Sequence, residues 1–192
     1  SATNPAAFTS PSGSYTIPIP VARDWASNGA DSEDRNQEQV RRHSAGGFWT
    51  FIPGPQTNAV EAKGTALTQQ AGNAGRDRFV QESGMETAVI QVTWSKAEVN
   101  SLAEDFKACT QFHREKKIWV ASSDQELQVA GHKAICGRYK VDMAGSLIFG
   151  TILLVHVDGH RYEIDYSYTE ELANPGATLD RIKQMTFARQ KQ

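Results

Sequence analysis

Two histidines and two carboxylates lie close together in the stretch LLVHVDGHRYEIDYSY. His156 and His160 are four residues apart, and Glu163 and Asp165 follow them. On a helix, histidines at this spacing share one face and can bind zinc together. The same side chains could supply a general acid and a general base, as a small hydrolase requires. What this stretch can do depends on whether it folds as a helix or as a β-hairpin.

The pattern favours a hairpin. Asp158 and Gly159 separate two strand-like stretches, and Asp-Gly is typical of a two-residue type I′ turn, in which both residues have positive φ. Side chains alternate across a strand, so His156 and His160 point to opposite faces. The register pairs Val157 with His160, His156 with Arg161, Val155 with Tyr162, Leu153 with Ile164 and Thr151 with Tyr166. We therefore predict no catalytic site, no metal site and no cofactor here.

Composition limits the other classes of function. The chain has 192 residues, a formal net charge of -2 and a pI near 6.2, so it has no general attraction for nucleic acid. Its longest apolar stretch, residues 147–157, is about half of the roughly 20 residues that cross a bilayer, which predicts no transmembrane segment. The sequence contains no Gly-x-Ser-x-Gly, no phosphate-binding glycine loop and no His-Glu-x-x-His.

The first 14 residues are mainly Ser, Thr, Ala, Pro and Gly, with no charged residue. We expect a flexible tether over residues 1–14 and a single domain over residues 15–192. Such a tether is typical of a processed export precursor, and a lipid anchor could precede it. An arbitrary start of the chain would give the same pattern.

The first half of the domain gives weak signals. Residues 15–20 alternate like a strand, but Pro18 and Pro20 predict an edge position. Residues 27–43 are densely charged and favour a loop or a solvated helix. An aromatic strand is expected at residues 48–52, ended by Pro53-Gly54, and a mobile loop is plausible over residues 56–78.

The second half is clearer. Ser95 and Glu98 form a capping-box pattern, and the apolar positions Val99, Leu102, Ala103, Phe106 and Cys109 predict a helix that lies on a sheet. A second helix is expected at residues 175–187. We expect strands at residues 86–95, 117–121, 132–142, 147–157 and 160–168. These elements predict an α+β fold, an antiparallel β-sheet flanked by helices.

Aromatic residues on short strands are candidates for partner binding, because a tryptophan at a surface often anchors a partner protein. These are Trp49, Phe51 and Trp119. His113 is a fourth candidate for partner binding. It lies beside Arg114, Lys116 and Lys117 near the predicted end of the first helix, where a cation is favourable.

Three segments resemble the PsbP-like family of α-β-α sandwich proteins: YTIPIPVARDW, VAGHKAICGRY, and HRYEIDYSY with the closing IKQMTF. The likeness covers mainly residues 95–187, and the polar segment 27–78 departs from the family pattern. Relatives include thylakoid-lumen accessory proteins and bacterial envelope proteins such as DcrB and the LpqN-like lipoproteins. The resemblance implies an accessory protein that binds another protein and has no catalytic residues.

The two cysteines would distinguish compartments. Cys109 and Cys136 are either free thiols in the core, as in a cytoplasmic protein, or a disulfide that joins the helix to the sheet. Their 27-residue separation would make such a bond worth roughly 3 to 4 kcal/mol. Because the tether and the resemblance both indicate export, to a periplasm, a cell envelope or a thylakoid lumen, we favour the bond.

The function we expect is therefore that of a non-catalytic exported or envelope accessory protein that acts through protein–protein contacts. One alternative is an immunity protein or enzyme inhibitor that neutralises a toxin. Another is a small hydrolase with its site on the polar face of the hairpin.

Overall fold

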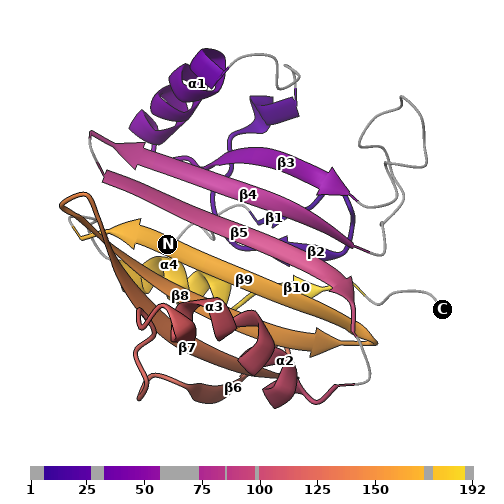
Figure 1. Ribbon diagram of the computed structural model, residues 1–192. Coiled ribbons are helices and arrows are strands. Elements are labelled where there is room, and N and C mark those ends of the chain that lie inside the picture. Colours follow the sequence, from indigo (N-terminus) through magenta and orange to yellow (C-terminus); the bar gives the residue numbers. More distant parts are fainter. Residues whose placement is uncertain are drawn as a thin grey trace.

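The computed structural model describes residues 7–26, 33–56, 74–84, 86–97, 100–170 and 175–188. These residues form an α+β fold built on a seven-stranded antiparallel sheet with the order β3-β4-β5-β9-β8-β7-β6 (Figure 1). Its strands are β3 (Thr50–Gln56), β4 (Ala74–Ser83), β5 (Glu86–Lys96), β6 (Gln125–Val129), β7 (His132–Met143), β8 (Ser146–Val157) and β9 (His160–Thr169).

The β8–β9 hairpin has the predicted register. His156 pairs with Arg161, and the turn residues Asp158 and Gly159 have φ of 46° and 80°, as a type I′ turn requires. Strand β8 is apolar on both faces because both of its faces are covered, and it lies inside the sheet between β9 and β7 as expected.

One face of the sheet carries the main core. A small sheet with the order β1-β2-β10 and the helix α4 (Pro175–Ile182) pack against it. The strands of this small sheet are β1 (Phe8–Thr9), β2 (Tyr15–Ile17) and β10 (Thr186–Phe187). Buried side chains from both layers meet in this core, which we call the inner face: Tyr15, Ile17, Ile90, Trp94, Leu153, Val155, Tyr162, Ile164, Tyr166 and Ile182.

The opposite face, the outer face, is covered in part by helices. Helices α2 (Leu102–Cys109) and α3 (Gln111–Glu115) lie over β7 and β8, where a second apolar cluster forms from Phe106, Ile135, Tyr139, Ile152 and Leu154. At the other end, α1 (Glu33–Ala45) contacts β3 and β4, and Nδ1 of His43 lies 2.8 Å from the Thr50 hydroxyl. The short 3-10 helix η1 (Arg23–Ala26) is tied to α1 by Asp24 and Arg42, 2.6 Å apart. None of the described helices is long and apolar enough to cross a membrane.

Several expectations for the first half were wrong. Strand β2 is the middle strand of the small sheet, not an edge strand, because it ends at Ile17 and leaves Pro18 and Pro20 outside the ladder. Strand β3 continues through Pro53 and Gly54, because it is itself an edge strand and its register shifts between Pro53 and Gln56. The predicted mobile loop over 56–78 ends in strand β4, while residues 57–73 lie outside the described residues.

The predicted tether was also wrong for its described part. Phe8 packs against the rings of Phe51 and Phe79, at centroid distances of 4.9 and 5.5 Å. The hydroxyls of Ser10 and Tyr15 donate to the buried Asp77 carboxylate, at 2.8 and 2.6 Å. Strands β1 and β2 form an N-terminal hairpin, and its connection contains Ser10, Ser12 and Ser14, which are all buried. The uncharged composition of this part therefore reflects burial rather than mobility.

The first helix of the second half begins later than predicted. Ser95 belongs to β5, and the true N-cap is Ser101, whose hydroxyl accepts from the Glu104 backbone N–H while the Glu104 carboxylate accepts from the Ser101 N–H. The Ser-x-x-Glu pattern at Ser95 recurs six residues later at Ser101, and strand pairing of β5 with β9 decides between the two. Residues 117–121 form only an isolated bridge, Trp119 with Tyr139, and strand β6 was not predicted.

Candidate functional site

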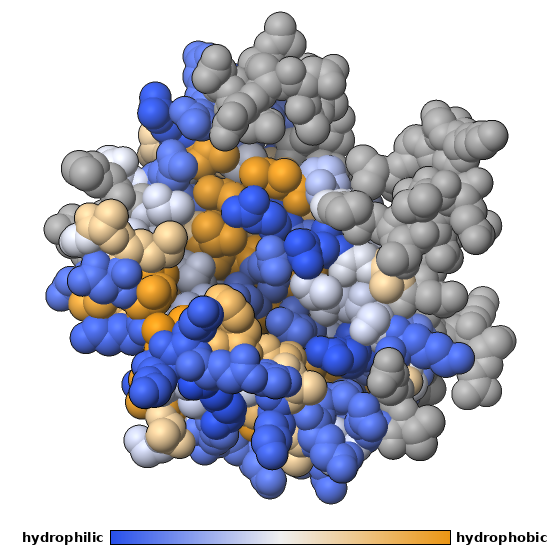
Figure 2. Space-filling model, in the orientation of Figure 1, coloured by the Kyte–Doolittle hydropathy of each residue, from blue (hydrophilic) through white to orange (hydrophobic). Residues whose placement is uncertain are grey.

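A cluster of aromatic and basic side chains lies on the outside of α3 and the turn that follows it. We call it the α3 surface; it consists of Phe112, His113, Arg114, Lys116 and Trp119. Phe112 is 61% exposed, which is unusual for a phenylalanine on a helix that lies on a sheet. The Lys116 ammonium lies 5.9 Å from the centroid of its ring. In Figure 2, mostly hydrophilic residues cover the lower part of this face, where α2 and α3 lie.

Trp119 is held in one orientation. Its ring lies so close to Gly137 of β7 that a Cβ at that position would come within 2.3 Å of Cζ2, so only glycine lets the indole lie on the strand. The indole Nε1–H donates to the Asp124 carboxylate at 2.9 Å, and the ring packs edge-on against Phe106. A tryptophan fixed in this way loses little conformational entropy when a partner binds.

Arg114 joins the helix to the segment before β6. Its guanidinium lies 2.7 Å from the Asp124 carboxylate and 4.8 Å from the centroid of the Trp119 ring. Its Nε–H donates to the hydroxyl of Thr110, which itself donates to the carbonyl of Phe106. Arg114 and Trp119 of the α3 surface are therefore preorganised by bonds within the chain.

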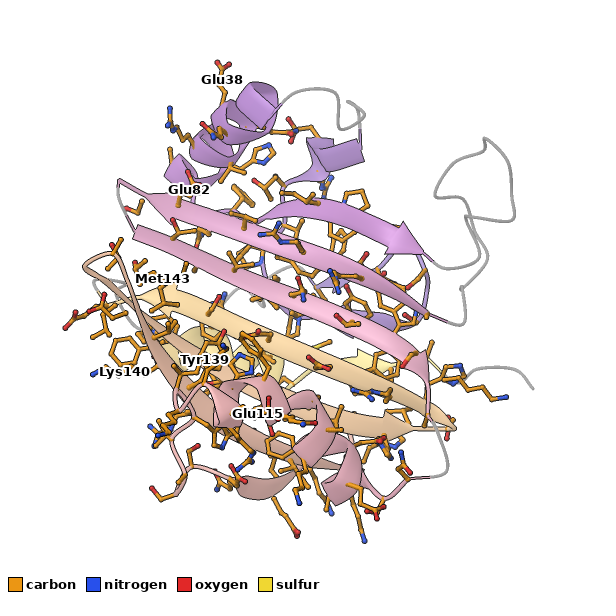
Figure 3. The ribbon with its side chains drawn as sticks, viewed as in Figure 1. Glu38, Glu82, Glu115, Tyr139, Lys140 and Met143 are labelled. Carbon is orange, nitrogen blue, oxygen red and sulfur yellow. The ribbon has the colours of Figure 1, made fainter. Side chains whose placement is uncertain are left out.

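His113 is the inner member of the α3 surface. Its ring lies 4.5 Å from that of Tyr139, which sits between α3 and the sheet (Figure 3). Burial lowers the pKa of His113, so the ring is neutral at physiological pH and works as a packing group. Tyr139 can lie flat because its neighbour across the ladder is Gly150, where a Cβ would come within 1.9 Å of its ring.

The structure brings together two of the four predicted partner-binding residues. Trp119 and His113 both belong to the α3 surface. Trp49 and Phe51 were wrong as exposed anchors, because they are 3% and 2% exposed and lie in the core. Phe112 was missed; its signal is an apolar residue off the apolar stripe of the helices, inside the basic run QFHREKK.

A second group of polar side chains follows strand β9 on the outer face. We call it the β9 seam; it consists of Arg161, Glu163 and Asp165 of β9, His156 of β8, Tyr139 of β7, and Asp105 and Cys109 of α2. Nε2 of His156 lies 2.7 Å from the carboxylate of Asp105, whose side chain is 3% exposed. Arg161 donates to Glu163 at 3.2 Å, and the Tyr139 hydroxyl donates to Asp165 at 2.9 Å.

Burial perturbs this seam. It raises the pKa of Asp165 to about 6 and the pKa of Glu163 above its usual range. It also raises the pKa of the Cys109 thiol to about 12, with Glu163 adding to the effect. A thiol with such a pKa stays protonated at neutral pH and is a poor nucleophile. The carboxylates of Asp105, Glu163 and Asp165 are each held by one partner within the seam and act there as hydrogen-bond acceptors.

The predicted disulfide is wrong for this fold. Cys136 lies in the core of the inner face, whereas Cys109 lies on α2 beside the apolar cluster of the outer face. The sheet separates the two thiols, and both are free. The prediction placed the helix on the sheet but did not determine which face of β7 Cys136 occupies.

The two histidines of the hairpin lie on opposite faces, as predicted. His156 contacts Asp105 on the outer face, while Nδ1 of His160 lies 3.3 Å from the carbonyl of Asp158 within the turn. Among the described residues, no group of three or more His, Cys, Asp or Glu side chains has the geometry to hold a metal ion.

No family model matches this sequence, and no curated sequence is significantly similar to it. The functional argument therefore depends on the geometry of the chain. Of the two groups of side chains, the α3 surface is the one that presents a large apolar side chain to the outside.

Proposed function

We propose that this chain is a non-catalytic accessory protein that binds another protein through the α3 surface. The observation that carries the proposal is the exposure of Phe112, whose ring lies near the Lys116 ammonium, on the same short helix as Arg114, which lies over the fixed Trp119 ring. Aromatic residues and arginine are the residue types most enriched where binding energy concentrates in protein interfaces. The arrangement suits a partner that offers an apolar pocket with acidic residues at its rim.

The β9 seam supports the non-catalytic part of the proposal. A catalytic acid or base must reach a substrate, and the seam carboxylates instead accept hydrogen bonds from Arg161 and Tyr139. Cys109 is the cysteine of the seam and could in principle act as a nucleophile, but burial keeps its thiol protonated. Burial under α2 accounts for the raised pKa values of Glu163 and Asp165, and the bonds from Arg161 and Tyr139 offset it in part.

Site-specific photo-crosslinking tests the binding surface. A photoreactive residue replaces Phe112 in the full chain, expressed in cells of the source organism, and the matched control places it at the exposed Gln184 beyond α4. We expect one dominant protein adduct from position 112, none of the same mass from position 184, and loss of the adduct with Arg114→Glu. An adduct with a toxin or other enzyme would indicate the immunity or inhibitor function. Equal labelling from both positions would reject the α3 surface as the binding site.

For the compartment, we propose export to the cell envelope. This proposal is supported by the resemblance to PsbP-like proteins described above and by nothing in the geometry of the fold. Cell fractionation with a cytoplasmic and an envelope marker tests it, and recovery of the chain with the cytoplasmic marker would reject it.

A further inference from the structure

Strand β6 leaves one side of its backbone without a neighbour among the described strands, because it ends the seven-stranded sheet and pairs there with β7 (Figure 1). The turn Ala130–Gly131, with φ of 50° and 80°, makes Val129 and His132 the hydrogen-bonded pair that closes the hairpin. Backbone groups of a strand point alternately to its two sides. The N–H and C=O groups of Glu126 and Gln128 therefore point away from β7.

The other end of the sheet is protected against further pairing, and β6 is not. Strand β3 contains Pro53, shifts register before Gln56, and is preceded by a parallel bridge between Val21 and Trp49. Prolines and irregular register are usual devices that prevent an edge from pairing with another chain. The sequence of β6, QELQV, contains no proline, no lysine and a single charge.

Two hollows flank the start of β6, one on each face of the sheet. The hollow on the outer face, about 390 Å³, is lined by apolar Ala103, Phe106 and Ile135, with Lys107 and Arg114 at its side. The hollow on the inner face, about 440 Å³, is lined by Arg138, Thr151, Leu179 and Lys183. Asp124 and Gln125 border both. Each exceeds the roughly 150 Å³ that holds a benzene ring.

We propose that β6 pairs with an extended segment of the partner protein, which adds an eighth strand to the sheet. Side chains of an added strand alternate between the two faces. One side chain then enters the apolar hollow beside Phe106, and the next enters the hollow with the cations of Arg138 and Lys183. The segment is therefore one in which apolar and acidic residues alternate. This inference rests on the proposed function and specifies which kind of segment the partner protein contributes.

A second copy of this chain fits the same edge poorly. Its β6 would offer the exposed side chains Gln125, Glu126 and Gln128, which supply no large apolar group for the outer hollow. A β6–β6 pair would leave that hollow unfilled. Charge complementarity and the apolar lining thus both favour a segment of another protein.

The test uses a library of random twelve-residue peptides displayed on phage and selected against the full chain. We expect enriched peptides to alternate apolar and acidic residues. Gln128→Pro removes only a backbone N–H that points away from β7, so the pairing of β6 with β7 should remain. The affinity of the best peptide should decrease about tenfold in Gln128→Pro and stay unchanged in the control Gln128→Ala. Arg138→Glu should decrease the affinity of this peptide by at least about tenfold. Enrichment of peptides without alternation, no enrichment, or equal binding to Gln128→Pro would overturn the proposal.

Hydrogen exchange on the unmodified chain gives a second measurement that needs no folded variant. The Glu126 and Gln128 amides should exchange fast in the free chain and become protected when the selected peptide binds. Protection confined to α3 would overturn the proposal, and a peptide-independent dimer that protects these amides would identify a second copy as the occupant. If the selected peptide binds Gln128→Pro and the unmodified chain equally while position 112 still crosslinks to its partner, the strand proposal fails and the α3 proposal stands.

Discussion

At the scale of single residues, the β9 seam shows how one buried carboxylate can set the pH response of a fold. Asp165 accepts a hydrogen bond from Tyr139, which favours the ionised form, but burial outweighs this bond and the pKa rises to about 6. The charge of neighbouring Glu163 raises it further. The ionised form of Asp165 is disfavoured because α2 and α3 cover strands β7 and β8 and partly shield the seam from solvent.

The sign of the resulting pH dependence follows from the shift. An unfolded aspartate has a pKa of about 3.9, so between roughly pH 4 and pH 6 the folded chain holds a proton that the unfolded chain has released. Stability therefore decreases as the pH rises through this window. We predict that Asp165→Asn raises the free energy of unfolding at pH 7 by about 1–2 kcal/mol and has a smaller effect at pH 4.

Urea denaturation at the two pH values measures this difference. Asp180→Asn, at an exposed position on α4, is the matched control and should change stability little at either pH. The amide oxygen of the asparagine can still accept from Tyr139, so the variant removes the charge and keeps the bond. A lower stability of Asp165→Asn at pH 7 would show that the ionised carboxylate stabilises the fold.

At the scale of elements, alternation and turn chemistry predicted the long hairpins well. The Asp-Gly turn alone fixed the register of β8 and β9, because a one-residue slip would have moved Leu153 and Ile164 out of the core.

Strand β4 was missed because Arg76, Asp77 and Arg78 look like loop residues. Arg76 and Arg78 are exposed on the outer face, and the Asp77 carboxylate between them is satisfied by Ser10 and Tyr15. Those partners lie more than sixty positions away, so no local pattern could reveal them.

The candidate site was predicted only in part for a similar reason. A run of basic residues around His113 was visible in the sequence, but the contact of Arg114 with Trp119 and Asp124 depends on how the chain turns after α3. Exposure of Phe112 could have been inferred from its position off the apolar stripe. Burial of Trp49 and Phe51 could not, because it depends on segments distant in the sequence. Phe8 of the N-terminal hairpin packs on Phe51, and the backbone of Trp49 bonds to Pro20 and Ala22.

The N-terminal hairpin should be an integral element of the fold. Removing residues up to Ser14 exposes the core around Phe51 and Phe79 and takes the Ser10 donor from the buried Asp77. We predict that a chain starting at Tyr15 loses about 3–5 kcal/mol of stability, the sum of the contacts of the partly buried Phe8 and of one hydrogen bond to a charged group. A chain starting at Ala7 keeps every described contact and is the control in the same thermal and urea unfolding. Equal stability of the two chains would contradict the integrated hairpin.

At the scale of the whole molecule, the sheet is a partition between two separate cores. The inner face is covered by the small sheet and α4, and the outer face is covered in part by α1, α2 and α3. Cys136 belongs to β7, and Cys109 belongs to α2, which contacts β7. The two cysteines nevertheless lie on different sides of the sheet. A bond between them would require one side chain to pass through the backbone of the sheet.

We therefore predict two free thiols per chain, counted under denaturing and non-reducing conditions in protein from any compartment. The free energy of unfolding should not respond to reductant, because no cross-link restricts the unfolded chain. A count of zero, with a single band that shifts after reduction, would show that one of the two elements occupies the other face.

The pairing of β2 with β10 also governs when this protein can finish folding. Thr16 and Thr186 are partners in the small sheet although 170 positions separate them. A ribosome that adds about 5 to 20 residues per second needs roughly 10 to 30 s to cover that distance. Throughout this time the apolar side chains of Tyr15, Ile17 and Ile19 lack the layer that buries them, and they are available to a chaperone. The small sheet can thus close over these side chains only after Thr186 and Phe187 have been synthesised.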